Sequence, residues 1–260
     1  MIDCHCHILP GIDDGAKDMD MSLAMARKAI SSGTTDIIAT PHNLNGAFAN
    51  NKTQIQNAVD ELQRQFDQLK LPLKIHPGSE CHLVPELIAQ VEKDMVMTYA
   101  NKGKALLVEL PKQMIPIGTD SIFTNLILMG ITPVIAHPER NTALRKNPRR
   151  LASWIETGCK VQLTAQSCSG EFGKELQKLC KTWCGQGWVH IVASDAHRPH
   201  GRSPDMTNGI KNLRNWLNKD ALEIIIHENP ANLLAGEPLR SIQPKQSRSL
   251  WRGLSFFREK

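Results

Sequence analysis

The chain has 260 residues, of which 41% are hydrophobic and 22% are charged. This composition is typical of a folded globular protein and excludes a largely disordered or membrane-embedded chain. The net charge is +5, but the last 21 residues carry six basic residues and one acidic residue, while the other 239 carry 25 of each. The body of the chain is therefore neutral, which argues against a nucleic-acid-binding surface.

The N-terminal residues lack the basic, apolar and small-residue regions of a secretory signal, and no apolar run is long enough to cross a bilayer. The seven cysteines are an odd number, so a disulfide framework is not expected. The sequence therefore predicts a cytoplasmic protein with reduced thiols.

Short apolar segments rich in β-branched residues alternate with longer segments of helical periodicity. Strands are predicted at residues 2–4, 35–40, 71–77, 104–110, 132–137, 159–165 and 189–194. Helices are predicted at 18–32, 51–70, 117–129, 147–157, 171–185 and 205–217. This alternation predicts a parallel α/β fold. The length of the chain suits one large domain.

Side chains that bind metals recur at the C-terminal ends of these predicted strands. In a closed parallel barrel all of those ends open on one face, so residues far apart in the chain converge there. An open sheet would instead spread them along an edge, so a barrel is favoured. The residues are His5, His7, His42, Glu80, Glu109, His137, Asp195 and His197.

A mixture of imidazoles and carboxylates suits Zn²⁺, Mn²⁺ or Fe²⁺ better than Ca²⁺, which prefers oxygen ligands alone. Each residue taken singly would be a hydrogen-bonded loop residue or a helix cap. Buried charges are costly unless they are paired or bound to metal, so the recurrence favours a metal site. The other histidines lack this placement and are expected to be structural or surface residues: His76, His82, His190, His200 and His227.

The N-terminal segment "DCHCH" alternates potential metal ligands with cysteines. On an extended segment, residues two apart point to the same side, so His5 and His7 can reach one ion. Cys4 and Cys6 are then expected to face together in the other direction, as buried packing residues.

The motifs "DCHCHILPGIDDGA", "ATPH", "GSE", "LVELP", "AHPER" and "SDAH" resemble, in order and spacing, the polymerase-and-histidinol-phosphatase (PHP) superfamily. More narrowly, they are similar to its bacterial manganese-dependent tyrosine-protein phosphatases, which act in capsular and exopolysaccharide synthesis. The resemblance covers about residues 1–237, and "HCHILPGIDDGA" together with "HPER" is its most specific part. It implies a distorted (β/α)₇ barrel of the TIM-like type, with the metal site at the C-terminal ends of the strands.

The resemblance also implies three divalent metal ions, with manganese preferred over iron and zinc. The matched positions that would surround the first ion are His5, His7, Glu80 and Asp195. A second ion would be bridged by Glu80 and held by Glu109 and His137. A third would be held by Asp14, His42 and His197, with Asp13 as the alternative to Asp14. Family arginines that contact the phosphate match Arg140 and Arg202.

The implied reaction is hydrolysis of phosphotyrosine in proteins by a metal-bound hydroxide. A metal lowers the pKa of its bound water, and cations absorb the charge that develops on the phosphoryl oxygens. His42 and His197 are expected to bind metal rather than transfer protons, because a bound metal excludes the proton from the same nitrogen. The implied substrate is a membrane-anchored bacterial tyrosine kinase.

Other activities remain as alternatives. A small-molecule phosphatase of the same superfamily, acting on a compound such as histidinol phosphate, is the first, and a non-catalytic module that binds phosphorylated partners is the second. A thiolate phosphatase is excluded, because no cysteine has an arginine six positions later. The chain departs from the family at Asn43, Phe48 and Gln166. These positions are expected in a substrate-side loop, where they bear on substrate preference.

Residues 238–260 are predicted to form a separate basic tail. One interpretation is a solvated, disordered extension. The other is an apolar stripe, flanked by arginines, that rests on an anionic membrane or on a partner. That stripe consists of Leu250, Trp251, Leu254 and Phe257. The sequence leaves homo-oligomerisation open.

Overall fold

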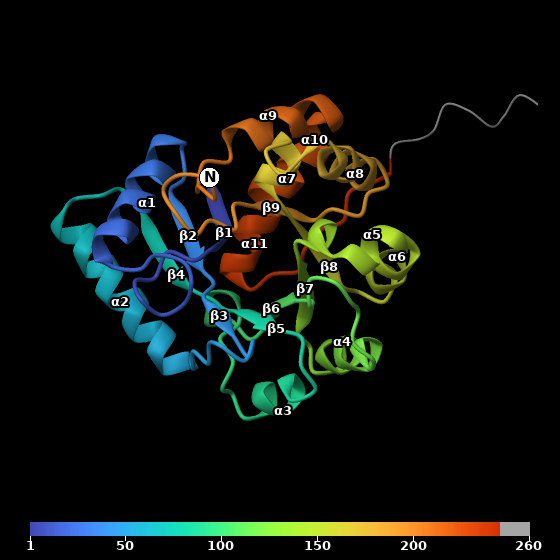
Figure 1. Cartoon of the computed structure of the whole chain (residues 1–260), viewed down its shortest axis with the longest axis horizontal. Coiled ribbons are helices and arrows are strands. Elements are labelled where there is room, and N and C mark those ends of the chain that lie inside the picture. The colour runs from blue at the N-terminus through green and yellow to red at the C-terminus, as the bar shows by residue number, and fades with distance from the viewer. Residues whose placement is uncertain (245–260) are drawn as a thin grey trace, which may run out of the picture.

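The computed structural model describes residues 1–244, in which seven parallel strand segments form a barrel (Figure 1). Two segments are interrupted once, so the strands are β1 (Ile2–Cys6), β2 (Asp36–Ala39), β3 (His42–Asn43), β4 (Lys74–Pro77), β5 (Glu80–His82), β6 (Ala105–Glu109), β7 (Thr132–Ala136), β8 (Lys160–Thr164) and β9 (Ile191–Ala193). Hydrogen bonds order them as β1-β2-β4 and β3-β5-β6-β7-β8-β9, and every pairing is parallel. The predicted α/β barrel is confirmed.

The two interrupted segments are β2–β3 and β4–β5, which lie side by side. The backbone N of Glu80 donates to the carbonyl O of Pro41 at 3.0 Å, which carries the pairing across both breaks. A Cβ added to Gly78 would lie 2.9 Å from Ile38 Cγ2, so the second break needs glycine for this close approach. Beyond the breaks, His42 pairs directly with Glu80.

The barrel closes between its first and last strands. The backbone N of Asp195 donates to the carbonyl O of His5 at 2.7 Å. Asp3, buried in β1, accepts hydrogen bonds from both the backbone N and Oγ of Ser194, which follows β9. Burial raises the pKa of Asp3 to about 6. These bonds join the segments that carry His5 and Asp195.

Most of the helices surround the strands on the outside of the barrel (Figure 1). The longer ones match the predicted helices and are α1 (Met19–Ser31), α2 (Lys52–Gln68), α4 (Thr119–Leu128), α6 (Pro148–Glu156), α8 (Lys174–Gly185) and α9 (Thr207–Trp216). Shorter ones, which the sequence analysis does not predict, are α3 (Leu87–Glu92), η1 (Tyr99–Asn101), η2 (Pro138–Arg140), α5 (Thr142–Lys146), α7 (Ala165–Ser169), α10 (Lys219–Glu223), the π-helical η3 (Ile224–Glu228) and α11 (Asn229–Ala235).

The first two helices begin at residues that favour helix starts. Asp18 caps α1 by accepting from the backbone N of Met21 at 2.9 Å, and Asn51 and Gln54 form a reciprocal capping box at the start of α2. The side chains that α2 buries against the barrel recur at the 3–4 residue spacing of a helix face and are Ile55, Val59, Leu62 and Phe66.

Apolar side chains form one core inside the barrel and further cores between the strands and the helices. The interior core draws on strands from all around the barrel and includes Cys4, Ile38, Leu107, Val134 and Ile191. Cys6 is equally buried but lies in an outer core with Met25 of α1. The expectation that Cys4 and Cys6 face the same way is therefore wrong. The β1–β2 register shifts between Asp3 and Cys6, and this irregularity breaks the strict alternation of side chains.

The described part of the predicted tail, residues 238–244, lies against the barrel. Leu239 and Ile242 are buried, and the backbone N of Arg240 donates to Asn229 Oδ1 at 2.8 Å. The predicted apolar stripe from Leu250 to Phe257 lies outside the described residues. Within residues 1–244, no helix has the length and apolar character needed to cross a membrane.

Candidate metal centre

Eight of the nine predicted metal ligands lie in the C-terminal parts of the strand segments or up to four residues beyond them. His42 and Glu80 begin the second pieces of the two interrupted segments, and the ninth, Asp14, lies in the loop after β1. The structure brings their nitrogen and oxygen atoms together in three groups, each with its atoms within 4.8 Å of one another. The first cluster is His5, His7, Glu80 and Asp195. The bridging cluster is His42, Glu80 and Glu109, and the open cluster is His7, Asp14, His42 and His197.

The first cluster is completely enclosed, since none of its residues is more than 1% exposed. Nε2 of His5 lies 3.4 Å from Glu80 Oε2 and 3.3 Å from Asp195 Oδ1. Nε2 of His7 lies 3.3 Å and 3.5 Å from the same two oxygens. Two imidazole nitrogens and two carboxylate oxygens therefore face one point.

The bridging cluster shares Glu80 with the first cluster. His42 Nδ1 lies 3.1 Å from Glu80 Oε2 and 3.9 Å from Glu109 Oε2. His137 belongs beside this cluster, because its Nε2 lies 2.8 Å from Glu80 Oε1 and 3.8 Å from Glu109 Oε1. Glu80 thus presents one oxygen to the first cluster and the other to His137.

The open cluster faces solvent through Asp14, whose side chain is 54% exposed. Asp14 Oδ1 lies 3.4 Å from Nε2 of His42 and 3.4 Å from Nε2 of His197. Burial and the nearby charge of His7 lower the pKa of His197 to about 4. His197 is therefore a neutral imidazole near pH 7, the form that binds a metal.

Several buried polar atoms of these clusters have no hydrogen-bond partner among the described residues. They are Glu80 Oε2, Asp195 Oδ1, His42 Nδ1 and His197 Nε2. Buried polar atoms are normally paired, because leaving one unpaired costs free energy. Although burial works against the charged carboxylates, His5 and neighbouring residues hold the pKa values of Glu80 and Asp195 well below their usual values. Charged oxygens and unpartnered nitrogens aimed at the same points fit divalent metal ions.

Asp13 and Asp14 have different surroundings. Asp13 Oδ2 lies 2.7 Å from His7 Nδ1 and accepts from the backbone N of His42 at 3.0 Å, while its Oδ1 accepts from Gly15 N at 2.9 Å. The oxygens of Asp13 are therefore occupied by protein groups, and its contact orients His7 from behind. This geometry favours Asp14 as the residue that faces the clusters.

Gln162 of β8 orients His5 in the same way, and the sequence analysis does not identify it. Its Oε1 lies 3.0 Å from His5 Nδ1, which leaves Nε2 directed at the first cluster. Such contacts fix the orientation and tautomer of metal-binding imidazoles. The available sequence signal is a glutamine inside an otherwise apolar strand segment, "KVQLT".

His137 and Asp195 have left-handed backbone conformations, with φ of 30° and 50°. Few residues other than glycine adopt positive φ, and such strained positions concentrate at functional sites. His137 directly follows β7, and Asp195 lies two residues beyond the end of β9. The unusual backbone therefore occurs where the chain turns its side chains into the clusters.

The two predicted phosphate-binding arginines meet at the edge of the first cluster. Arg140 Nη1 and Arg202 Nη2 both donate to Asp195 Oδ2, the second at 2.6 Å. Burial works against the charge of Arg140, but the carboxylate of Asp195 raises its pKa above the usual value. Two guanidiniums on one oxygen form a group that suits an anion such as a phosphoryl group.

Three positions at which the chain departs from the family lie around the site, in different roles. Phe48 stacks on the His42 imidazole, with 6.2 Å between ring centroids, and Asn43 is buried in β3. Gln166 is also buried, and its Nε2 donates to the carbonyl O of Ser203, so it holds the segment that carries Arg202. His82, which was expected to be structural or on the surface, lies beside the bridging cluster, where its Nδ1 is 3.4 Å from Glu109 Oε2.

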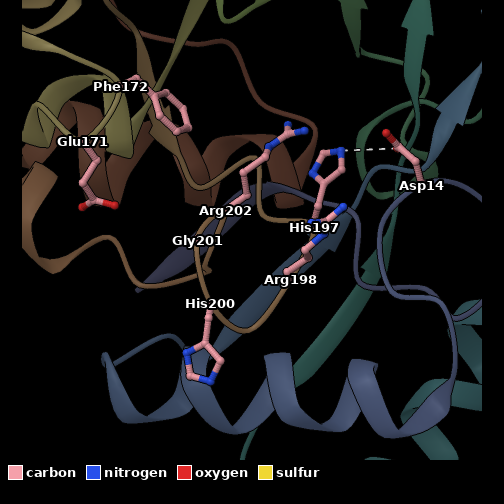
Figure 2. Close-up of a pocket in the computed structure, with 8 residues that line it drawn as sticks. All are labelled: Asp14, Glu171, Phe172, His197, Arg198, His200, Gly201 and Arg202. Carbon is pink, nitrogen blue, oxygen red and sulfur yellow. Dashed lines mark ion pairs between the residues drawn. The ribbon is translucent and has the colours of Figure 1, made fainter.

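A cavity of about 660 Å³ opens beside the open cluster. Figure 2 shows Arg202 between Phe172 and the ion pair of His197 with Asp14. The cavity therefore connects solvent with a metal-type cluster and with one of the two arginines. Its lining is completed by Glu171, Arg198, His200 and Gly201.

Comparisons with known proteins identify the family of the chain. The family model "Capsular polysaccharide synthesis, CpsB/CapC" matches residues 1–235. The tyrosine-protein phosphatase YwqE of Bacillus subtilis is 36% identical over 253 residues, covering 96% of this chain and 99% of that protein. The putative tyrosine-protein phosphatase CapC of Staphylococcus aureus is 36% identical over 197 residues, covering 76% and 77% of the two chains.

The structural comparison leads to the same group. A solved structure from the pair YwqE of Bacillus subtilis and CpsB of Streptococcus pneumoniae, named as metal-dependent tyrosine phosphatases, superposes with a TM-score of 0.90 at 34% identity. The superposition covers 96% of this chain and 100% of the chain in the solved structure. A phosphotriesterase homology protein of Escherichia coli, with a TM-score of 0.56 at 12% identity over 89% of this chain and 97% of that one, shares the fold alone. The chain belongs to the CpsB/CapC family of capsular polysaccharide synthesis proteins.

Proposed function

We propose that this chain is a metal-dependent protein-tyrosine phosphatase. The observation that carries the proposal is the convergence of three clusters of imidazoles and carboxylates, with unpartnered buried atoms, beside two arginines. Membership of a family whose relatives are named tyrosine-protein phosphatases supports the same reaction. It favours phosphotyrosine over histidinol phosphate or another small phosphate ester as the substrate.

The three clusters support three divalent ions, with manganese as the preferred metal and iron or zinc as alternatives. One ion would be held by the first cluster. A second would be held by Asp14, His42 and His197, and a third by Glu80, Glu109 and His137. When bound, such ions lower the pKa of water and withdraw charge from phosphoryl oxygens. Asp13 and Gln162 would keep the imidazoles of His7 and His5 in the orientation that binding requires.

The arginines of this chain would bind and orient the phosphate. Arg140 and Arg202 lie at Asp195, so a phosphoryl group at the cluster edge meets two cationic donors as charge develops on its oxygens. Because phenolate is a comparatively good leaving group, no dedicated acid is required beside it.

The physiological substrate that fits this family is a membrane-anchored bacterial tyrosine kinase of capsule or exopolysaccharide synthesis, and the cytoplasm is where the two would meet. The family description supports the connection with capsule synthesis. The relatives' names support phosphotyrosine in a protein as the chemical group attacked.

The test is a comparison of kcat/KM for a phosphotyrosyl peptide, the matched phosphoseryl peptide and histidinol phosphate, with manganese present throughout. The proposal expects the phosphotyrosyl peptide to be hydrolysed most efficiently. Preference for histidinol phosphate would instead establish the small-molecule activity. Binding of the phosphopeptide without any hydrolysis would indicate a non-catalytic module.

Replacing Arg140 tests the role of the arginines. Arg140→Ala is expected to lower kcat/KM on the phosphotyrosyl peptide by about a hundredfold or more, the scale seen when a donor to developing phosphoryl or oxyanion charge is lost. Bound metal, measured by elemental analysis, should be unchanged, and Arg149→Ala on the exposed surface of α6 is the control. Wild-type turnover in Arg140→Ala would remove the role.

A further inference from the structure

A second cavity, of about 350 Å³, lies next to the catalytic site and is lined by cationic side chains. We call it the basic groove. Its walls come from the loop after β6, from η2 and α5, from the segment between α7 and α8, from the first turn of α8, and from the segment after β9. The lining residues are Lys112, Arg140, Thr142, Arg145, Phe172, Leu176 and Arg202.

The basic groove adjoins the 660 Å³ cavity beside the open cluster, which we call the site cavity. Phe172 and Arg202 line both. Figure 2 shows Phe172 on the side away from Asp14, with Arg202 between them. Arg140 forms a further link, since its guanidinium lies over the Phe172 ring at 5.8 Å from the centroid and it also lines a small cavity with Glu109 and His137. A substrate whose phosphate lies at Arg140 and Arg202 can therefore extend directly into the groove.

Two of the four cationic side chains that line the groove have no ionic partner among residues 1–244. No carboxylate side chain is among its lining residues. Arg140 and Arg202 contact Asp195, but Lys112 and Arg145 form no ion pair with any residue of the described part of the chain. The acidic residues of the adjoining cavity are Asp14 and Glu171, and Glu171 accepts a hydrogen bond from Ser169 Oγ. In a body with equal numbers of acidic and basic residues, this concentration of cations is a local feature.

We propose that the basic groove binds acidic residues that flank the phosphotyrosine of a protein substrate. The inference rests on the proposed phosphatase function and adds a sequence preference to it. Carboxylates of the substrate would lie near Lys112 and Arg145, and Phe172 with Leu176 would contact the apolar parts of its side chains. An extended peptide is suited to this task, because the groove and the site cavity adjoin at Phe172 and Arg202.

Two phosphotyrosyl peptides test the proposal. One carries aspartate or glutamate on both sides of the phosphotyrosine, and the other has asparagine or glutamine at the same places. The acidic peptide is expected to have the higher kcat/KM, and the ratio between the peptides should fall as salt is raised, since exposed charges are screened. Equal kcat/KM values for the two peptides at low salt would overturn the proposal.

Charge reversal tests whether the groove causes the preference for the acidic peptide. Lys112→Glu and Arg145→Glu are each expected to reduce the ratio of kcat/KM for the acidic over the neutral peptide by roughly fivefold, the scale of one exposed ion pair. The matched control is Lys146→Glu, because Lys146 is exposed beside Arg145 in the last turn of α5 but does not line the groove. A ratio that falls equally in the control would show that general charge, and not the groove, sets the preference.

Binding is measured separately, so that failure of the groove and failure of the phosphatase function are distinguished. Versions of both peptides with a non-hydrolysable phosphonate in place of the phosphate are labelled, and their Kd values follow from fluorescence anisotropy. Tighter binding of the acidic version without turnover of either phosphopeptide would support the groove and contradict the phosphatase function. Turnover of both peptides with equal Kd values would support the phosphatase and overturn the groove.

Discussion

At the scale of single residues, adjacent side chains in the loop after β1 have separate tasks. Asp14 faces the imidazoles of His42 and His197, whereas Asp13 contacts His7 from behind and accepts two backbone hydrogen bonds. A metal-binding imidazole depends on such a contact for its tautomer and orientation. The "DD" pair therefore supplies one candidate ligand and one residue that positions a ligand.

Replacing Asp13 tests this division. Asp13→Asn is expected to weaken metal binding by about 10- to 100-fold, the usual effect of losing such a supporting carboxylate. Competition with a metal-sensitive dye measures the affinity. Asp18→Asn, at the exposed cap of α1, is the control and should leave metal affinity unchanged. An unchanged affinity in Asp13→Asn would show that His7 is oriented without this contact.

The sequence predicts the candidate ligands more completely than the residues that support them. Ligands such as His5 and Glu80 stand out because polar residues at the ends of apolar strands repeat along the chain. Gln162 and Gln166 belong to no such recurring pattern in the sequence. Their contacts join segments that only the fold brings together. The pairing of Arg140 and Arg202 on one oxygen of Asp195 depends equally on tertiary structure.

At the scale of elements, the loop after β1 folds back tightly on its own strand. A Cβ added to Gly15 would lie 2.1 Å from the carbonyl O of His7 and 2.9 Å from Asp13 Oδ1. The backbone N of Ala16 donates to the same carbonyl at 3.0 Å. Glycine is therefore required for the loop to hold Asp13 and Asp14 over the end of β1.

Gly15→Ala is expected to displace this loop, lowering both metal affinity and the free energy of unfolding, the latter by about 2 kcal/mol or more. Urea denaturation and dye competition measure the two effects. Gly185→Ala is the matched control, since a Cβ there meets nothing within 4 Å and the residue is in α8. If Gly15→Ala retained the metal affinity of the wild type, the loop would not be needed to position the ligands.

The strands were predictable because β-branched and apolar runs are short, regular and well separated. The continuations β3 and β5 were not, since the predicted strands end at residues 40 and 77 and the continuations have only two and three residues. The irregularity in β1 that separates Cys4 from Cys6 is also invisible in an alternating sequence. Helices of one or two turns, such as α5 and α7, offer too few residues for a periodic signal.

At the scale of the whole molecule, a buried histidine far from the clusters joins the last strands to the segment that follows α11. His190 Nδ1 accepts from the backbone N of Val161 at 3.2 Å, Nε2 lies 3.2 Å from Ser241 Oγ, and the carbonyl O of His190 accepts from Asn229 Nδ2. Burial, with the charge of Lys160, lowers the pKa of His190 to about 3. The folded protein therefore holds this imidazole neutral.

This depressed pKa predicts how stability depends on pH. The unfolded chain protonates His190 near its usual pKa of about 6.5, whereas the folded chain does so only near 3, so the unfolded state binds more protons between these values. The free energy of unfolding should fall by about 1.4 kcal/mol per pH unit from this residue as pH decreases through that window. In His190→Gln, urea denaturation at pH 7 and pH 5 should show a smaller loss, and an identical loss would contradict the prediction.

The barrel as a whole brings ligands from the first and last strands to one point, and metal dependence is the central claim that follows from this convergence. The most direct measurement is phosphate release from a phosphotyrosyl peptide by chelator-stripped protein during back-titration with Mn²⁺. We predict no release from the stripped protein and a rate that rises with bound metal until the clusters are filled. Undiminished release from fully stripped protein, or no release from folded protein that has taken up the metal, would contradict the account.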